Sequence, residues 1–428
     1  MSLRPYLDLL RDSNLLIEIE EKVKLENEIT NYLQLNDGKA VLFHKIEDSE
    51  FPLLGNVLSS RDQIKNALSE QEGYYRAFQQ ALIQPSEPHD VETSLTFTNR
   101  KQVNLNDLPI PRFFPSDGGR YLTSGIVFSQ FPTTKETNMS IHRIMIISAT
   151  KGAIRLVPRD LYNIFSENRQ NGIDTPVAIA IGYHPILGLA SSSPTPSGKS
   201  ELFIANSLMK GTLSVVKTPK YGIKTPTDVE FILEGRIMAN EETEEGPFVD
   251  ITGTSDDVRK QPIIEIEEIY HRNNPIFQTI LPAHNEHFIL MGFPREALIH
   301  NYISSIVPAV QGVYLTHGGC GWLHAVISIT PHKDGDAKKV GQAAFEAHPS
   351  LKWCTIVNDD IDIYNYTAVE WATITRAGQN DITIIESAKG SSLDPSRNRR
   401  DNTSIKVIID ATKKEEKGNK GYKRIIPF

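Results

Sequence analysis

Short apolar runs follow one another through the middle of the chain: Gly125-Ile126-Val127-Phe128, Ile144-Met145-Ile146-Ile147, Val177-Ala178-Ile179-Ala180 and Thr212-Leu213-Ser214-Val215-Val216. Between Leu122 and about Pro247, helical spacing of apolar residues occurs in two places, around 158–170 and 200–209. Many short strands with few helices are typical of a barrel or sandwich, not of a doubly wound sheet. The middle of the chain is therefore predicted to be built mainly of strands.

The region before this core alternates between helix and strand. Apolar periodicity predicts helices at 3–11, 25–35 and 61–82 and strands at 16–19 and 40–43. Prolines at positions 85, 88, 109, 111 and 115 interrupt regular structure, which predicts a linker near 85–117.

The last third alternates again. Strands are predicted at 313–315, 325–329, 354–357 and 382–385, with helices at 336–347 and 367–376. This order favours a sheet with crossover helices. The fold class is therefore α/β (α+β), in three parts: an N-terminal α/β region and linker (1–117), a strand-rich central domain (118–305) and a C-terminal α/β domain (306–428).

Composition narrows the function classes. The chain has 428 residues, a formal net charge of −8 and two cysteines, Cys320 and Cys354. The negative charge argues against nucleic-acid and membrane-surface partners, and the cysteine count fits a reducing compartment. No signal-peptide pattern or membrane-length apolar run is present, so a cytoplasmic protein is expected. The Lys- and Glu-rich stretch 413–423 is expected to be a solvated, mobile tail.

The segment Glu244-Glu245-Gly246-Pro247-Phe248-Val249-Asp250 is the most informative local motif. Gly-Pro between acids makes a rigid turn, so Glu245 and Asp250 are expected to face a common space. Two carboxylates held close together cannot both ionise easily, which favours a proton donor near neutral pH. A turn without a function is the alternative reading.

Two further stretches suit anions and hard cations. In Asn138-Met139-Ser140-Ile141-His142-Arg143, the amide oxygen suits a divalent cation and the guanidinium suits a carboxylate or phosphate. Strand alternation allows only a subset of these polar side chains to share one site. The loop 190–200 is rich in Ser, Thr and Pro and suits an anion, and Glu201 at the following helix is a candidate metal ligand.

Two other motifs are set aside. Gly198-Lys199-Ser200 resembles the end of a P-loop, but Ser193 stands where the upstream glycine is required, so a nucleoside triphosphatase is rejected. His317, Cys320 and His324 lack a nearby fourth zinc ligand and are expected to belong to a tight strand connection.

Together, the order and spacing of these motifs resemble one family. Asn-x-Ser-Ile-x-Arg at 138–143, Ser-x-x-Pro-x-Pro-x-Gly-x-x-Glu at 191–201 and Glu-Gly-Pro-Phe-x-Asp at 245–250 are similar to motifs of the UbiD decarboxylases. Lys352 with the following run 357–362, and the segment 390–395, are similar to later family segments. The resemblance implies a central split β-barrel that binds prenylated FMN, and assembly into dimers or hexamers.

The resemblance also implies roles for single residues. Arg143, Glu245 and Asp250 match the family's catalytic Arg-Glu-Glu network, with Asp in place of the final Glu. Asn138 and Glu201 match ligands of a divalent metal, usually Mn2+, that grips the flavin phosphate, with K+ nearby. The remaining expected cofactor contacts, beside Asn138, Glu201 and Arg143, are Ser140, Ile141, Ser191 (at the K+ site) and Lys352.

One departure from the family concerns the metal. The family usually has a histidine ligand shortly after the arginine strand, and the stretch 152–158 contains none. Water or the phosphate then completes the metal shell, or Arg155 supplies charge to the phosphate directly.

The resemblance implies non-oxidative decarboxylation of an α,β-unsaturated acid, with a flavin prenyltransferase of the UbiX type as cofactor supplier. The stretch 155–161 and Asp250 look like the archaeal branch that converts anhydromevalonate 5-phosphate to isopentenyl phosphate. Arg143, Arg155 and Arg159 are of the right type to bind a phosphate. The alternatives are an aromatic, hydroxybenzoate-type acid decarboxylase and a flavin-binding protein that does not decarboxylate.

Overall fold

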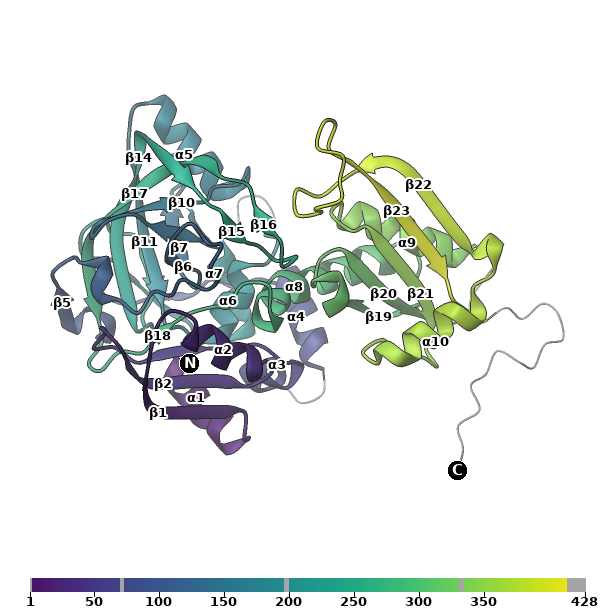
Figure 1. Cartoon of the computed structure of the whole chain (residues 1–428), viewed down its shortest axis with the longest axis horizontal. Coiled ribbons are helices and arrows are strands. Elements are labelled where there is room, and N and C mark those ends of the chain that lie inside the picture. The colour runs from purple at the N-terminus through teal and green to yellow at the C-terminus, as the bar shows by residue number, and fades with distance from the viewer. Residues whose placement is uncertain (1, 70–72, 196–199, 331–334, 414–428) are drawn as a thin grey trace. The chain divides into compact units, whose positions relative to one another are not determined.

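A computed structural model describes residues 2–69, 73–195, 200–330 and 335–413 (Figure 1). Internal contacts divide the chain into two compact units, Met1–Leu290 and Met291–Phe428. Helix α8 (Asn285–Ser304) runs through the point of division. The predicted tail at 413–423 lies outside the described residues after Lys413.

The first unit begins with a small α/β layer. Its four-stranded sheet has the order β1-β2-β3-β18, in which β1 and β2 are parallel. The strands are β1 (Leu16–Val23), β2 (Ala40–Ile46), β3 (Leu53–Gly55) and β18 (Phe277–Gln278). The helices are α1 (Leu3–Asp12), α2 (Glu28–Leu35), α3 (Arg61–Leu68) and α4 (Tyr74–Ile83).

A curled nine-stranded sheet forms the centre of the first unit and confirms the predicted strand-rich barrel. Its order is β6-β9-β10-β17-β14-β11-β7-β8, and β5 pairs with β17. The strands are β5 (Asn99–Lys101), β6 (Tyr121–Leu122), β7 (Ile126–Gln130), β8 (Thr137–Ile141), β9 (Ile144–Ile146), β10 (Lys151–Ile154), β11 (Thr175–Ile181), β14 (Phe231–Glu245) and β17 (Arg259–His271).

Short elements complete the first unit. Helices α5 (Asp160–Gln170), α6 (Pro185–Ser191) and α7 (Glu201–Leu208) pack beside the sheet. Strands β4 (His89–Asp90), β12 (Ser214–Lys217) and β13 (Lys224–Pro226) form a small sheet, and β15 (Phe248–Val249) pairs with β16 (Ser255–Asp256).

The second unit is a mixed five-stranded sheet of order β19-β20-β21-β23-β22. The strands are β19 (Val310–Leu315), β20 (His324–Ile329), β21 (Trp353–Asn358), β22 (Ile382–Lys389) and β23 (Thr403–Asp410). Strands β20, β21 and β23 run parallel, and α9 (Asp336–Ala347) and α10 (Tyr366–Arg376) pack against them. The predicted crossover helices are confirmed.

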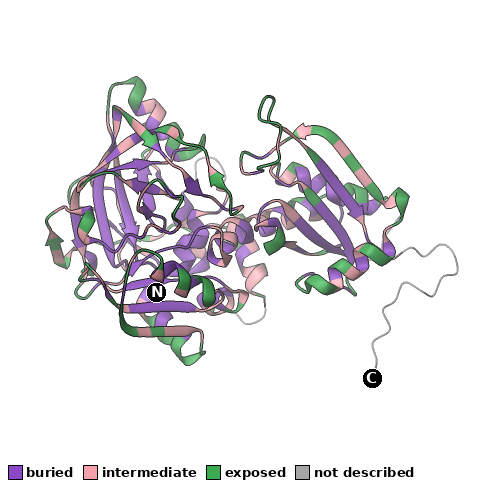
Figure 2. Cartoon of the chain, in the orientation of Figure 1, coloured by how far each residue is buried: buried purple, intermediate pink, exposed green. Residues whose placement is uncertain are grey.

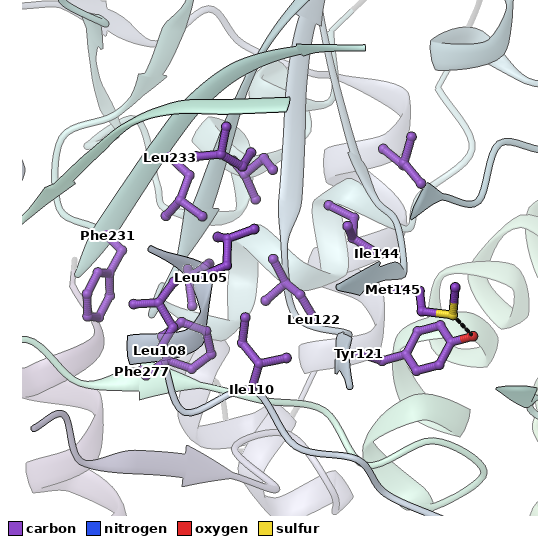
Figure 3. Close-up of a cluster of buried hydrophobic side chains, with 14 of the residues drawn as sticks. Leu105, Leu108, Ile110, Tyr121, Leu122, Ile144, Met145, Phe231, Leu233 and Phe277 are labelled. Atoms are coloured by element: carbon purple, nitrogen blue, oxygen red, sulfur yellow. Dashed lines mark hydrogen bonds between the residues drawn. The ribbon is translucent and has the colours of Figure 1, made fainter. Parts of the chain in front are cut away.

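Each unit has its own buried apolar core (Figure 2). The core of the first unit joins the small sheet to the curled sheet, and Figure 3 shows part of it, with Leu105, Leu122, Phe231 and Phe277 pointing together. Burial of this large apolar surface is the main favourable term for folding. The curled sheet is thereby a fixed support for the polar side chains at its rim.

One helix prediction was wrong, and two helices were not predicted. The expected helix 61–82 is two helices, because Ser69 and Gly73 adopt left-handed backbone conformations. Helix α6 was not predicted because every one of its residues is buried, so no polar face marks the helical period. Helix α8 was missed because it contains Pro294 and lacks a clear apolar stripe.

None of the helices in the described ranges combines the length and the apolar character that a membrane span needs.

Candidate active site

The predicted acidic turn lies at the end of the longest strand. Strand β14 ends at Glu245, the Gly246–Pro247 peptide is cis, and β15 follows at once. The backbone of Gly118 approaches this turn so closely that a Cβ there would lie 2.2 Å from the Gly246 carbonyl oxygen. Gly118 N–H also donates to Pro247 O at 2.7 Å. Glycine at position 118 therefore lets the segment before β6 fix the turn.

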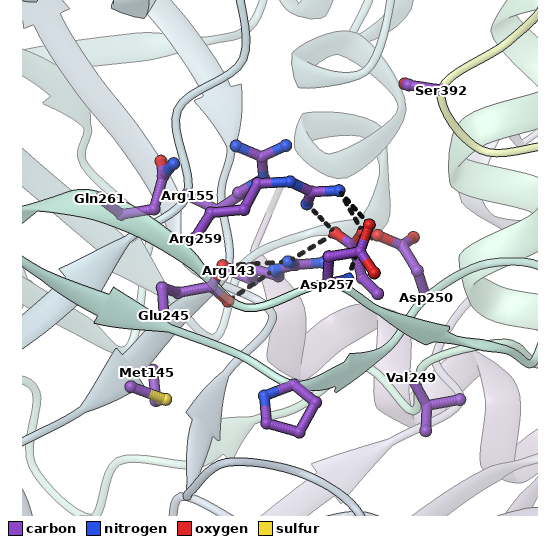
Figure 4. A network of polar contacts seen from close by, with 12 residues as sticks. Arg143, Met145, Arg155, Glu245, Val249, Asp250, Asp257, Arg259, Gln261 and Ser392 are labelled. Atoms are coloured by element: carbon purple, nitrogen blue, oxygen red, sulfur yellow. Dashed lines mark hydrogen bonds and ion pairs between the residues drawn. The ribbon is translucent and has the colours of Figure 1, made fainter. Parts of the chain in front are cut away.

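Arg143 joins the two acids that the sequence predicted (Figure 4). It follows β8 and donates from Nε and Nη2 to both Glu245 oxygens at 2.9 and 3.0 Å. Its Nη1 donates to Asp250 Oδ2 at 2.7 Å. The bidentate pair fixes the guanidinium plane, so Asp250 is held in a defined direction. The expectation that Glu245 and Asp250 face a common space is confirmed.

A third acid, Asp256, was missed by the sequence reasoning. Arg143 Nη2 donates to Asp256 Oδ2 at 3.0 Å, and Arg259 donates to both Asp256 oxygens at 2.6 and 2.7 Å. Burial raises the pKa of Asp256, but the hydrogen bonds and charges of Arg259 and Arg143 outweigh it and lower that pKa to about 2. Asp256 is therefore a permanent anion that holds the two guanidinium groups together.

The two acids of the predicted pair differ in their access to solvent. The side chain of Glu245 is 0% exposed, whereas that of Asp250 is 21% exposed. Burial lowers the pKa of Arg143, but Glu245, Asp250 and Asp256 more than reverse this and raise it above its ordinary value. Arg143 thus stays charged, and Asp250 is the acid of the predicted pair that a reactant can approach.

Two aromatic rings, those of Phe248 and Tyr121, pack beside this network. The Arg143 guanidinium lies 4.4 Å from the centre of the Phe248 ring, which is a cation–π geometry. Tyr121 packs against Phe248 with ring centres 4.6 Å apart. These contacts hold the Arg143 guanidinium against the aromatic ring of Phe248.

His287, on the first turn of α8, is a further neighbour that the sequence reasoning missed. Its Nδ1 accepts from Ala283 N–H at 3.2 Å. Burial lowers the pKa of His287, and the charges of Asp250 and Arg143 act on it in opposite directions. The sequence did not point to His287, because the helix that carries it, α8, was not predicted.

The predicted metal ligands Asn138 and Glu201 also come together. Glu201 is the first residue of α7, and its Oε2 accepts from Met139 N–H at 2.9 Å and from Asn138 Nδ2 at 3.5 Å. Its Oε1 accepts from Thr195 Oγ1 at 2.7 Å. Burial raises the pKa of Glu201 to about 7, and the nearby charge of Asp160 adds to the rise. A buried carboxylate of this kind is stabilised by a cation.

A chain of polar side chains runs from Asn138 along one face of β8. Ser140 Oγ lies 3.1 Å from Asn138 Oδ1 and 2.9 Å from His142 Nε2, and His142 Nδ1 lies 2.9 Å from Arg155 O. Burial lowers the pKa of His142 to about 4, so the ring is neutral at pH 7. A carbonyl only accepts, so Nδ1 carries the proton and Nε2 accepts from Ser140. Asn138 Oδ1 is then free to bind another group.

The other predicted cofactor contacts have local partners. Ser191 is buried at the end of α6, and its hydroxyl donates to Gly188 O at 2.8 Å. Ile141 is half-buried and pairs with Ile126. Lys352, in the second unit, contacts Asp394 at 3.2 Å and Ser396. Their contacts with a cofactor stay predictions.

The two motifs that were set aside are the His-Cys-His group at 317–324 and the P-loop-like segment at 198–200. Both ring nitrogens of His324 form hydrogen bonds within the second unit, to Thr316 Oγ1 at 3.1 Å and to Thr355 Oγ1 at 3.0 Å. These contacts fit the expectation that His324 belongs to a strand connection. Gly198 and Lys199 lie outside the described residues. In the part of the chain that is described, no three His, Cys, Asp or Glu side chains gather as a metal cluster.

Comparison with family models covers most of the chain. The N-terminal, Rift-related and C-terminal domains of the 3-octaprenyl-4-hydroxybenzoate carboxy-lyases match residues 7–82, 86–285 and 288–411. The chain belongs to the UbiD family. The acids and the arginine described above therefore lie in the Rift-related domain of a UbiD protein.

Relatives in the UbiD family cover nearly the whole chain. The anhydromevalonate phosphate decarboxylases of Methanosarcina mazei and Methanothermobacter thermautotrophicus are 40% and 37% identical to it, with 96% of each chain covered. The UbiD-class enzyme HmfF from Pelotomaculum thermopropionicum, in complex with FMN, superimposes with a TM-score of 0.97 at 31% identity. The match covers 100% of this chain and 97% of HmfF. An evolved dimeric form of HmfF is in complex with prenylated FMN.

Proposed function

We propose that this protein decarboxylates trans-anhydromevalonate 5-phosphate to isopentenyl phosphate and CO2, using prenylated FMN, in a modified mevalonate pathway. The observation that carries the proposal is the ion-pair network in which Arg143 holds buried Glu245 and the more exposed Asp250. The archaeal relatives named for this reaction support the choice of substrate.

The site suits a bound flavin. When bound, prenylated FMN supplies the electron sink that no side chain offers to the carbanion left by CO2. Around it, Asn138, Ser140, Ile141 and Arg143 form the β8 side of the proposed cofactor site. When the Ser140 hydroxyl donates to His142, Asn138 Oδ1 receives no hydrogen bond from Ser140 and can bind another group.

The proposed metal is a divalent cation, with Mn2+ as the expected ion and K+ close to Ser191. The amide oxygen of Asn138 and the carboxylate of Glu201 are hard oxygen donors of the kind that such a cation takes. Asp160, at the start of α5, adds negative charge near Glu201, which favours a cation at this place. The flavin phosphate and water fill the remaining positions.

The acids divide the work. Asp250 is the proposed proton donor to the carbon that CO2 leaves, because it is the more exposed carboxyl of the pair. Glu245 is fully buried and acts through Arg143. Four of the five Arg143 N–H groups are engaged by the three acids, so one N–H on Nη1 remains for the substrate carboxylate.

The proposal extends to assembly and supply. A dimer or hexamer, a UbiX-type flavin prenyltransferase as cofactor supplier and a cytoplasmic location remain predictions. The division into an N-terminal region (1–117), a barrel domain (118–305) and a C-terminal domain (306–428) also remains a prediction.

The test is CO2 release by the purified holoenzyme. The phosphorylated unsaturated acid and a hydroxybenzoate are incubated separately, and the extracted cofactor is identified by its absorbance and mass. CO2 from the first acid alone supports the proposal. CO2 from the hydroxybenzoate alone assigns the protein to the aromatic acid decarboxylases. Ordinary FMN without CO2 from either acid marks a flavin-binding protein that does not decarboxylate.

A further inference from the structure

Arg155 lies on the curled sheet near Glu245 and Asp256. Strand β10 pairs with β9 and with β17 on its two sides. Continuing the β9 register by one residue sets Arg155 opposite Arg143, and continuing the β17 register by two residues sets it opposite Gln261. The backbone hydrogen bond from Arg155 N–H to Arg143 O at 3.1 Å supports the first pairing. The side chain of Gln261 is also close, because its Oε1 accepts from Leu156 N–H at 2.8 Å. Residues directly opposite each other present their side chains on one face.

The same face continues to the acidic turn. Arg259 lies opposite Glu245 in the β14–β17 pairing and two residues before Gln261. Arg259 is thus a diagonal neighbour of Arg155, and Figure 4 shows their side chains next to each other. The ends of four adjacent strands, β9, β10, β17 and β14, therefore bring Arg143, Arg155, Arg259 and Glu245 to one surface.

These three arginines are not equally compensated. Arg143 contacts three carboxylates, and Arg259 contacts Asp256. Within the described residues, Arg155 forms no ion pair, and its one side-chain hydrogen bond goes to Leu156 O at 3.3 Å. Burial, then the charges of Arg259 and Arg143, lowers the pKa of Arg155 and outweighs the opposite effect of the Asp256 and Glu245 charges. Like charges side by side cost free energy, so this half-buried guanidinium calls for an anion from outside the chain.

We propose that Arg155 is the specificity-determining residue that binds the phosphate monoester of the substrate. The inference rests on the proposed function, because the substrate has anionic groups at both ends. Arg143 is already neutralised by acids and keeps one N–H for the carboxylate. Arg155, one strand away and without an ion pair among the described residues, offers its planar N–H groups to the phosphate oxygens, which is the bidentate geometry arginine provides. The flavin phosphate is the competing source of the same anion.

The test measures binding separately from turnover. Isopentenyl phosphate is titrated into the holoenzyme by calorimetry, and 3-methyl-3-buten-1-ol serves as the probe without phosphate. Arg155→Gln is expected to raise the Kd of isopentenyl phosphate roughly 10- to 100-fold, the effect of losing charge-assisted hydrogen bonds. The Kd of the alcohol and the flavin content should not change. Arg155→Lys keeps the charge but not the planar pair of N–H donors. Its Kd for isopentenyl phosphate should lie between those of the wild type and Arg155→Gln.

The matched control is Lys151→Gln, which removes a cation from the same strand where it pairs with exposed Glu241. Its Kd values should equal those of the wild type. An unchanged Kd for isopentenyl phosphate in Arg155→Gln overturns the inference. Loss of flavin with an unchanged Kd also overturns it and assigns Arg155 to the cofactor phosphate.

Failure of the proposed function gives a different result. In that case the wild-type holoenzyme releases no CO2 from the phosphorylated acid, whatever Arg155 does. A weakened Kd in Arg155→Gln would still establish the phosphate site. Normal CO2 release by the wild type with no change in Kd would reject the Arg155 assignment alone.

Discussion

At the scale of the residue, Arg143 is better viewed as the organiser of the site than as its reactive group. Removing one partner of a buried ion pair leaves the other charge uncompensated, at a cost of about 3–5 kcal/mol. Because Glu245 is fully buried, an Arg143 variant would lose stability together with activity. Substitutions at the more exposed Asp250 separate the chemistry from the fold.

Asp250→Asn is expected to retain the cofactor and lose turnover. The amide keeps an oxygen for Arg143 Nη1 but removes the acidic proton, and loss of a positioned general acid lowers kcat roughly 100- to 10,000-fold. Flavin absorbance and CO2 release measure the two effects. Asp257→Asn, which changes an exposed acid of the same hairpin, is the control and should keep full activity. Unchanged turnover in Asp250→Asn would remove Asp250 from the mechanism.

Glu286 makes the stability of the fold depend on pH. It is buried at the start of α8, accepts from Leu58 N–H at 3.2 Å, and its Oε2 has no partner. Burial raises the pKa of Glu286 to about 8. The folded chain therefore holds a proton that the unfolded chain releases above its ordinary pKa of 4.5. The contribution of Glu286 to stability is fully present below pH 4.5 and is lost as the pH rises to about 8, by up to about 5 kcal/mol.

Glu286→Gln should remove this slope, because the amide is neutral at every pH and keeps the acceptor for Leu58. Thermal denaturation at pH 6 and pH 9 measures it. The wild-type Tm should drop more between the two values than the Tm of the variant. Equal drops would show that Glu286 does not titrate in this window.

At the scale of the element, the sequence predicted the motifs better than their surroundings. The turn at Glu245 and the proximity of Asn138 to Glu201 were predicted because their residue types and spacing carry the chemistry, whereas their binding of a metal stays a prediction. Asp256 was missed because it reaches Arg143 through the β15–β16 pairing, in which Phe248 lies opposite Asp256, and no local pattern marks that register. Helix α6 was missed because burial on all sides removes the periodic signal.

Helix α7 gives the sharpest element-level prediction. Its first residue, Glu201, contacts β8, so both elements must be in place for the proposed metal and flavin phosphate to bind. Glu201→Gln keeps an acceptor for Met139 N–H but removes the charge that a cation requires. We expect loss of bound flavin and of metal, measured by absorbance and by elemental analysis. The exposed acid variant Glu242→Gln should retain both, and a full flavin spectrum in Glu201→Gln would contradict the metal assignment.

At the scale of the whole molecule, the two units have separate apolar cores, which sets a limit on cooperativity. Ile179 in β11 and Ile327 in β20 are both 0% exposed, one in each core. Replacing either with alanine removes the same side-chain volume and costs about 2–5 kcal/mol. Because the cores share no residue, each loss should be confined to its own unit.

Hydrogen exchange followed by mass spectrometry tests this confinement, with each variant as the control for the other. Ile327→Ala should speed amide exchange in β19–β23 and leave β7, β11 and β14 protected as in the wild type. Ile179→Ala should do the reverse and also release flavin, because β11 lies next to the strand pair β7–β8 that carries Asn138 and Ser140. Equal loss of protection in both units from either variant would mean that the chain unfolds as one cooperative body.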